Sequence, residues 1–99
     1  MAARESAPTE SEREGAERAL IGRWIKPSTH RPSEMVLAES GVAVWAVVGY
    51  ARGVDDDVEE VARAYRVPAD AVRAALAYYR RHPLQIDAKL AANAAWHTA

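Results

Sequence analysis

Two short apolar stripes, separated by a proline, constrain the fold of this chain more than any other feature of its sequence. Each stripe has the i, i+3, i+4 spacing of one helix face; the members are Val58, Val61, Ala62 and Tyr65, then Val72, Ala75, Leu76 and Tyr79. Asp57 can cap the first helix, and Glu60 completes a capping box. Pro68 ends that helix and suits the first position of the next, and Asp70 suits its first turn. Residues 54–81 therefore predict the corner of a helix-turn-helix.

Such a corner must pack on a third element, and a third apolar stripe precedes it. Its members are Val44, Val47, Val48 and Ala51. We expect a helix that begins near Val44 and has Gly53 as its C-terminal cap. Before this helix, residues 34–39 and 42–45 predict a strand and a return strand, joined by a tight turn at Gly41.

The remaining segments flank this core. Residues 1–18 are polar and lack an apolar period, which predicts a disordered or frayed tail. The apolar residues of 19–25 do not settle strand against helix, and we favour a short strand. Residues 19–82 are expected to form the hairpin and helix-turn-helix domain. Residues 83–99 are rich in alanine and begin with a proline, which predicts an additional helix. The expected fold is mainly α: a three-helix helix-turn-helix core, a short N-terminal β-hairpin and an extra C-terminal helix.

Composition narrows the class of protein. The chain has 99 residues and no cysteine, which excludes disulfides, thiolate zinc sites and cysteine catalysis. Its three histidines lie far apart, and neither a phosphate-binding loop nor a serine nucleophile motif occurs, so we expect no enzyme, metal or cofactor. Apolar runs are shorter than the roughly 20 residues that span a bilayer, and the N-terminus lacks a signal-peptide pattern. We therefore expect a cytoplasmic protein.

The aromatic residues suggest self-association. Phenylalanine is absent, so three tryptophans and four tyrosines supply the bulky side chains. A small core and several aromatics that are expected to be exposed predict a homodimer with Trp24, Trp45 and Tyr78 at its interface.

The predicted second helix has few groups that can read DNA bases. Its outward positions are Ala69, Asp70, Arg73 and Ala74, of which only Arg73 offers a bidentate donor to guanine. Other arginines can contact phosphates, which position a protein without specifying sequence. The candidate DNA-binding residues are Arg63, Arg66, Ala69, Asp70, Arg73, Arg80 and Arg81; Arg66 also stands where a glycine usually makes the turn.

Charge limits this DNA-binding interpretation. Residues 54–67 contain five acids and two arginines, a net charge of −3, whereas residues 68–99 contain four cations and two acids, a net charge of +2. Only one face can therefore approach DNA, and a dimer must double the contacts. A dimerisation or interaction module with a helix-turn-helix shape but no DNA binding is the alternative.

One stretch resembles a known family. It reads VAVWAVVGYARGVDDDVEEVARAYRVPADAVRAALAYYRRHPLQID, with VAVW at 42–45, DDD at 55–57, VP at 67–68, AALAYY at 74–79 and then His82. These motifs resemble the domain-of-unknown-function family 433, whose members are similar to VapB-like antitoxins of type II toxin–antitoxin systems. The resemblance covers residues 32–90. The Gly-Thr-Arg run that often precedes the first motif is replaced here by Ala-Glu-Ser-Gly at 38–41.

The resemblance implies a three-helix fold of homeodomain-like or winged type, a function and two partners. It implies an antitoxin that neutralises a ribonuclease toxin with a PIN-like fold and represses its own operon through a dimeric helix-turn-helix. The partners would be that toxin and operator DNA.

The C-terminal segment is the candidate toxin-binding element. Ile86 and Leu90 are spaced one helical turn apart, as anchors in a helix-in-groove contact are, and Trp96 is a candidate hot spot. The alternative is that this helix folds back on its own domain.

Overall fold

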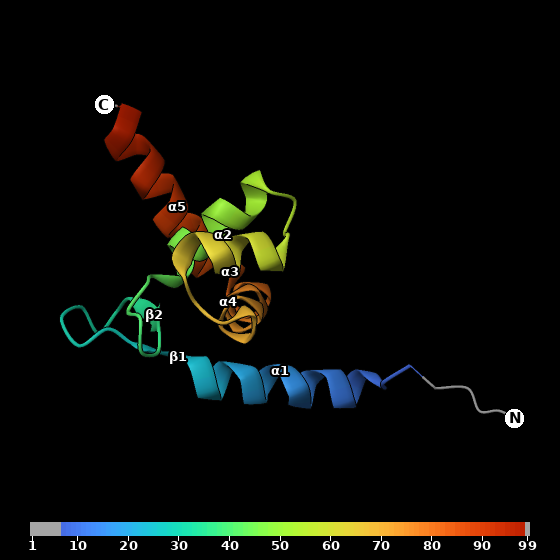
Figure 1. Ribbon diagram of the computed structural model, residues 1–99. Coiled ribbons are helices and arrows are strands. Elements are labelled where there is room, and N and C mark those ends of the chain that lie inside the picture. Colours follow the sequence, from blue (N-terminus) through green and yellow to red (C-terminus); the bar gives the residue numbers. More distant parts are fainter. Residues whose placement is uncertain (1–6, 99) are drawn as a thin grey trace, which may run out of the picture.

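The computed structural model describes residues 7–98, with side chains for residues 7–95. Its elements are α1 (Glu10–Trp24), β1 (Ile25–Pro27), β2 (Met35–Leu37), α2 (Val44–Gly53), α3 (Val58–Tyr65), α4 (Ala69–Arg81) and α5 (Pro83–Thr98). Over these residues the fold is mainly helical, with one small antiparallel sheet of two strands, which confirms the predicted mainly α class (Figure 1). None of the described helices has the length and apolar character needed to cross a membrane.

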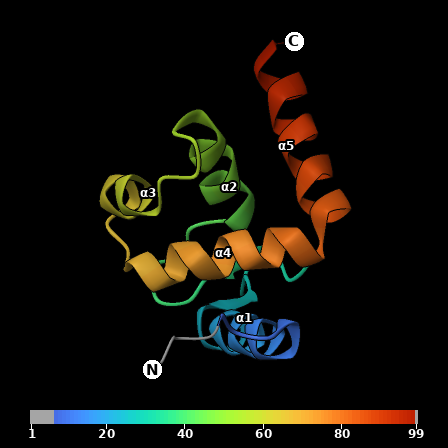
Figure 2. The ribbon, with the colours of Figure 1, turned by 90° about the vertical axis from the view of Figure 1, so that its right-hand side faces the viewer.

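Helix α4 lies between two layers of helices. Its buried residues are Ala71, Val72, Ala74, Ala75, Ala77 and Tyr78. Figure 2 shows α1 on one side of α4 and helices α2, α3 and α5 on the other. Alanine favours the helix and, being small, lets neighbouring helices approach closely. A helix with neighbours on two sides leaves only a narrow edge to solvent.

The predicted apolar stripes form the core between α2, α3 and α4. Its fully or almost fully buried members include Val44, Val47, Val48, Ala51, Val61, Val72 and Ala75. Helix α2 begins at Val44, as predicted. Each buried valine contributes roughly 1.5–3 kcal/mol relative to its exposed state. Apolar periodicity therefore located these three helices correctly.

The turn from α2 to α3 differs from its prediction. Gly53 is the last residue of α2 and is not the left-handed cap that was expected. Positive φ angles occur instead at Asp55 (54°) and Asp56 (58°), and the Asp56 amide donates to the Ala51 carbonyl over 2.8 Å. Aspartate tolerates the left-handed region better than most side chains do. The acidic run therefore builds this turn.

The hairpin also differs from its prediction. Strand β1 pairs antiparallel with β2, with Ile25 opposite Leu37. The predicted return strand over residues 42–45 is wrong, because only Ala43 forms a bridge to Val36 and α2 begins at the next residue. The predicted turn at Gly41 is confirmed by its φ of +75°. The helical period that starts at residue 44 outweighs the β propensity of its valines.

Helix α1 corrects two further predictions. Residues 10–18, expected to lie in a frayed tail, and residues 19–24, expected to form a strand, are helical; residues 1–6 lie outside the described part of the chain. A capping box starts this helix: the Thr9 hydroxyl accepts from the Glu12 amide over 3.0 Å, and the Glu12 carboxylate accepts from the Thr9 amide over 2.8 Å. Trp24 is the buried residue of α1, and the helix's N-terminal part extends beyond the other helices (Figure 1).

Helix α5 packs on the domain through its first half. Ile86 is only 2 % exposed, and the half-buried Leu90 lies against α2 at Gly49. The second half extends away from the body, as Figure 1 shows. The alternative in which this helix folds back on its own domain therefore holds for residues 83–90.

Candidate nucleic-acid interface

The N-terminus of α3 carries half of the predicted capping box. The Asp57 carboxylate accepts from the Glu60 amide over 3.2 Å. The Glu60 carboxylate, however, accepts from the Tyr50 hydroxyl over 3.2 Å and from Arg63 over 2.7 Å. The Arg63 guanidinium holds the pKa of Glu60 below its ordinary value, and the Glu60 carboxylate raises the pKa of Tyr50. Arg63, a predicted phosphate contact, is thus paired with an acid of its own helix.

The turn from α3 to α4 depends on Arg66. This residue has φ 58° and ψ 48°, the left-handed conformation that glycine usually supplies, and its amide donates to the Ala62 and Arg63 carbonyls. Pro68 is the N-cap of α4, so the expectation that it opens the helix as first residue is wrong by one position. The Arg66 side chain is exposed and forms no ion pair within the described residues.

The start of α4 presents a neutralised surface. Arg73, the predicted base-reading residue, donates to Asp70 over 2.8 Å and lies 3.7 Å from the Glu59 carboxylate. Its side chain is 48 % exposed. Ala69 is half-buried, and Ala74, expected to face outward, is fully buried. A phosphate that approached Arg73 would therefore meet two carboxylates.

Helix α1 occupies the other end of α4. Arg80 donates to the Glu17 carboxylate over 2.7 and 3.1 Å. Arg81 donates to the Glu14 carbonyl over 3.1 Å and lies 3.6 Å from Glu17. The Arg80 guanidinium holds the pKa of Glu17 below its ordinary value. Both arginines are thus engaged by a helix that sequence analysis did not anticipate.

The predicted dimer residues have different surroundings. Trp24 and Tyr78 are only 8 % and 7 % exposed within one chain. The Tyr78 ring packs on His82 with centroids 4.4 Å apart, and its hydroxyl donates to Gln85 over 3.1 Å. These two residues therefore contradict the assumption that they are exposed for a second copy. Trp45 is half-buried beside a shallow surface hollow.

The predicted toxin-binding residues also differ in their surroundings. Ile86 and Leu90 pack within the domain, so they are not free anchors; the side chain of Trp96 lies outside the described residues. Sequence analysis missed a polar contact that holds α5 in place. Arg52 donates to the Tyr79 hydroxyl over 2.7 Å and to Asp87 over 2.8 Å, and Tyr79 donates to Asp87 over 2.9 Å. No local spacing signals this contact, because its members come from three helices.

The comparisons with known proteins add no identification. No protein-family model, curated protein or solved structure matches this chain. Among the described residues, no group of histidine and acidic side chains could hold a metal ion. Function must therefore be argued from the residues and their geometry.

Proposed function

We propose that this protein is an antitoxin of a type II toxin–antitoxin pair. It binds and neutralises a PIN-like ribonuclease toxin and represses its own operon as a homodimer, with α3 and α4 forming a helix-turn-helix on α2. The observation that carries the proposal is the placement of the motif residues that resemble family 433. Within the VAVW, VP and AALAYY motifs and at position 72, the buried residues are Val44, Val72, Ala74, Ala75, Ala77 and Tyr78.

This burial supports a shared fold because the motif residues contact one another. The Tyr78 ring packs on His82, so the AALAYY motif contacts the histidine that follows it in the family pattern. Asp57, the last residue of the acidic run, caps α3. Residues that determine packing are those that a family must retain to keep its fold.

The second half of α5 is the proposed toxin contact. Residues 91–95 belong to the half of α5 that projects in Figure 1, and four of them are exposed, although Ala92 and Asn93 still border a shallow hollow beside Trp45. An amphipathic or alanine-rich helix that projects from a domain can enter a groove on a partner. The toxin contact therefore moves from Ile86 and Leu90 to the residues that follow them.

Co-expression tests the antitoxin assignment. The product of the neighbouring reading frame is induced alone, with the wild-type chain, and with a Val72→Asp variant that disrupts the core. We expect growth arrest by the toxin, relief by the wild type and none by the variant, together with a complex that survives size-exclusion chromatography. A neighbouring product without ribonuclease activity, or arrest that the wild type does not relieve, contradicts the assignment.

One observation favours a second candidate, an interaction or dimerisation module that does not bind DNA. Helix α1 lies across α4 on the side away from α2 and α3, and Ala74 and Ala77 are fully buried (Figure 2). This candidate predicts no shift of the promoter fragment even at low salt. The antitoxin proposal predicts a shift that weakens steeply as salt is added.

A further inference from the structure

The arginines predicted to contact DNA are mostly not the free ones. Arg63, Arg73 and Arg80 each form an ion pair of 2.7–2.8 Å with a carboxylate, and Arg81 lies 3.6 Å from Glu17. Exposed ion pairs of this kind are weak and can be broken. The carboxylate nevertheless stays nearby and repels an incoming phosphate, so these positions are poor phosphate contacts.

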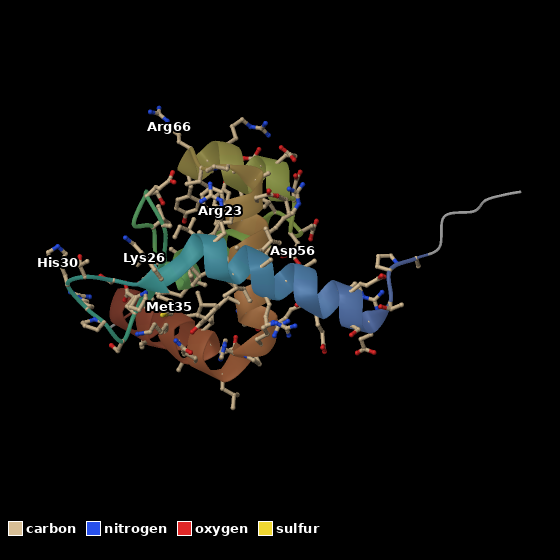
Figure 3. All side chains as sticks on the ribbon, turned by 90° about the horizontal axis from the view of Figure 1, so that it is seen from below. Arg23, Lys26, His30, Met35, Asp56 and Arg66 are labelled. Atoms are coloured by element: carbon tan, nitrogen blue, oxygen red, sulfur yellow. The ribbon has the colours of Figure 1, made fainter. Side chains whose placement is uncertain are left out.

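Other cations form no ion pair among the described residues, and four of them are exposed on segments from the end of α1 to the hairpin loop and in the α3–α4 turn. They are Arg23 at the end of α1, Lys26 in β1, Arg31 in the hairpin loop and Arg66 in the α3–α4 turn. Figure 3 shows Arg23 and Lys26 by the C-terminal end of α1, the exposed His30 at the tip of the hairpin loop and Arg66 at the outer edge of the α3–α4 region. We name Arg23, Lys26, Arg31 and Arg66 the hairpin-side basic surface.

Surface hollows lie beside two of these cations, Arg23 and Lys26. Arg23 and Asp70 line one open hollow of about 460 Å³, which joins the end of α1 to the start of α4. Lys26 and His30 line a second hollow of about 220 Å³ at the hairpin. Glu39 also lines the second hollow but forms no ion pair in the described structure. Arg23 and Lys26 therefore each border an open hollow, whereas Arg31 and Arg66 line neither of the two.

We infer that the hairpin-side basic surface binds the phosphate backbone of duplex DNA. The inference rests on the DNA-binding half of the proposed function and moves the contact away from the outward side of α4. The Arg23 guanidinium lies 4.5 Å from the Trp24 ring centroid, and this cation–π contact holds it in position. Exposed cations on successive elements contact phosphates but do not read base edges. The binding is therefore expected to tolerate different DNA sequences.

Two features favour duplex DNA over other polyanions. Proteins that bind single strands stack bases on exposed aromatic rings, but the aromatic ring next to this surface, Trp24, is only 8 % exposed. Proteins that bind anionic membranes insert apolar side chains, whereas the exposed large apolar residues described here, Tyr50 and Leu84, lie on α2 and α5. The surface offers charge alone.

Fluorescence anisotropy with labelled duplexes of two unrelated sequences tests the inference. Lys26→Gln and Arg31→Gln are compared with Lys89→Gln, which removes an unpaired cation on α5, and with Arg73→Gln. We expect each hairpin variant to weaken binding to both duplexes about 5- to 10-fold at 0.1 M salt and to lower the salt slope by about 1. Lys89→Gln and Arg73→Gln are expected to change neither quantity. Circular dichroism melting confirms that each variant remains folded.

Three outcomes overturn the inference. The first is loss of binding in Arg73→Gln with no change in the hairpin variants, which returns the contact to α4 and leaves the proposed function intact. The second is tighter binding to single-stranded RNA or to anionic vesicles than to duplex DNA. The third is an absence of duplex binding by the wild type at low salt, which removes the DNA-binding half of the proposed function as well.

Discussion

Arg66 has a left-handed backbone conformation, which its side chain disfavours. A left-handed conformation costs an ordinary L-residue roughly 1–2 kcal/mol, and glycine avoids that cost. The turn nevertheless forms because the helices on either side pack on α2 through Val61 and Val72, which are fully buried. Tertiary packing therefore compensates for a locally unfavourable residue.

A matched pair of substitutions measures that cost. Arg66→Gly and Arg66→Ala both remove the charge, but only glycine relieves the left-handed strain. Glycine also loses more backbone entropy on folding, by roughly 0.5–1 kcal/mol. We expect Arg66→Gly to have a free energy of unfolding about 0.5–1 kcal/mol above that of Arg66→Ala in urea denaturation. Equal stabilities would contradict the conformation described for Arg66.

The lowered pKa of Asp87 predicts how the stability of the protein depends on pH. Hydrogen bonds from Arg52, and then from Tyr79, hold the pKa of Asp87 below its ordinary value, which is about 3.9. A carboxyl whose pKa is lowered by folding contributes stability that is fully present above that ordinary value. The contribution is lost as pH falls through the lowered value.

We therefore expect the stability difference between wild type and Asp87→Asn to be constant from pH 5 to pH 7 and to shrink below about pH 4. Thermal unfolding across this range, followed by circular dichroism, measures it. Asp55→Asn is the control, because Asp55 is exposed and forms no ion pair within the described residues. A difference for Asp87→Asn that remains constant at acid pH would show that the contact with Arg52 does not persist in solution.

At the scale of elements, the sequence predicted helices that carry an apolar stripe and missed the one that does not. Helices α2, α3 and α4 each bury residues at helical spacing, so their positions were predictable. Helix α1 buries only Trp24 and is held by Thr9, Glu12 and ion pairs to α4. Its capping box, Thr9-x-x-Glu12, was the one local signal, and periodicity alone gave no indication of it.

The contact between α2 and α5 is so close that a larger side chain at the interface can test it. A Cβ atom at Gly49 would lie 3.0 Å from the Leu90 Cδ2 atom, whereas one at Gly53 would meet nothing within 4 Å. We expect Gly49→Leu to lower the free energy of unfolding by about 1–3 kcal/mol, because overpacking forces α5 outward. Adding Leu90→Ala should recover part of this loss.

Gly53→Leu is the matched control for that substitution. It introduces the same side chain in the same helix without a steric conflict, and it raises helix propensity by about 0.8–1 kcal/mol. We expect it to be neutral or stabilising in urea denaturation. If Gly49→Leu were equally well tolerated, α5 would not pack on α2 as described.

At the scale of the whole molecule, the candidate site was predictable only in part. The sequence identified which residues carry positive charge, but ion pairs such as Arg80 with Glu17 join residues far apart in the chain. Whether Arg80 and Arg81 are free depends on where α1 crosses α4, and that crossing rests on contacts between residues far apart in the chain. The sequence of α5 has the same limit. Its apolar spacing is compatible with burial of Ile86 in the domain and with docking on a partner, and only the structure shows that Ile86 is buried in the domain.

The two halves of α5 differ in burial, which predicts different roles for them in the whole molecule. A chain that ends after His82 loses Ile86, a 2 % exposed core residue, and also the contact of Asp87 with Arg52. Because removal of a buried isoleucine side chain alone costs about 2–5 kcal/mol, we expect this chain to lack a cooperative thermal transition. A chain that ends after Leu90 retains both contacts, and we expect it to remain folded.

The same pair of truncations tests the toxin contact, because only the chain ending at Leu90 separates folding from binding. We expect it to melt cooperatively within about 8 °C of the full chain, as a loss of 1 kcal/mol or less implies for a domain of this size. Without residues 91–99 it should fail to co-purify with the toxin or to relieve growth arrest. Undiminished toxin binding by this folded chain would exclude the projecting half of α5 as the contact. An unfolded chain would show instead that residues 91–99 stabilise the domain itself.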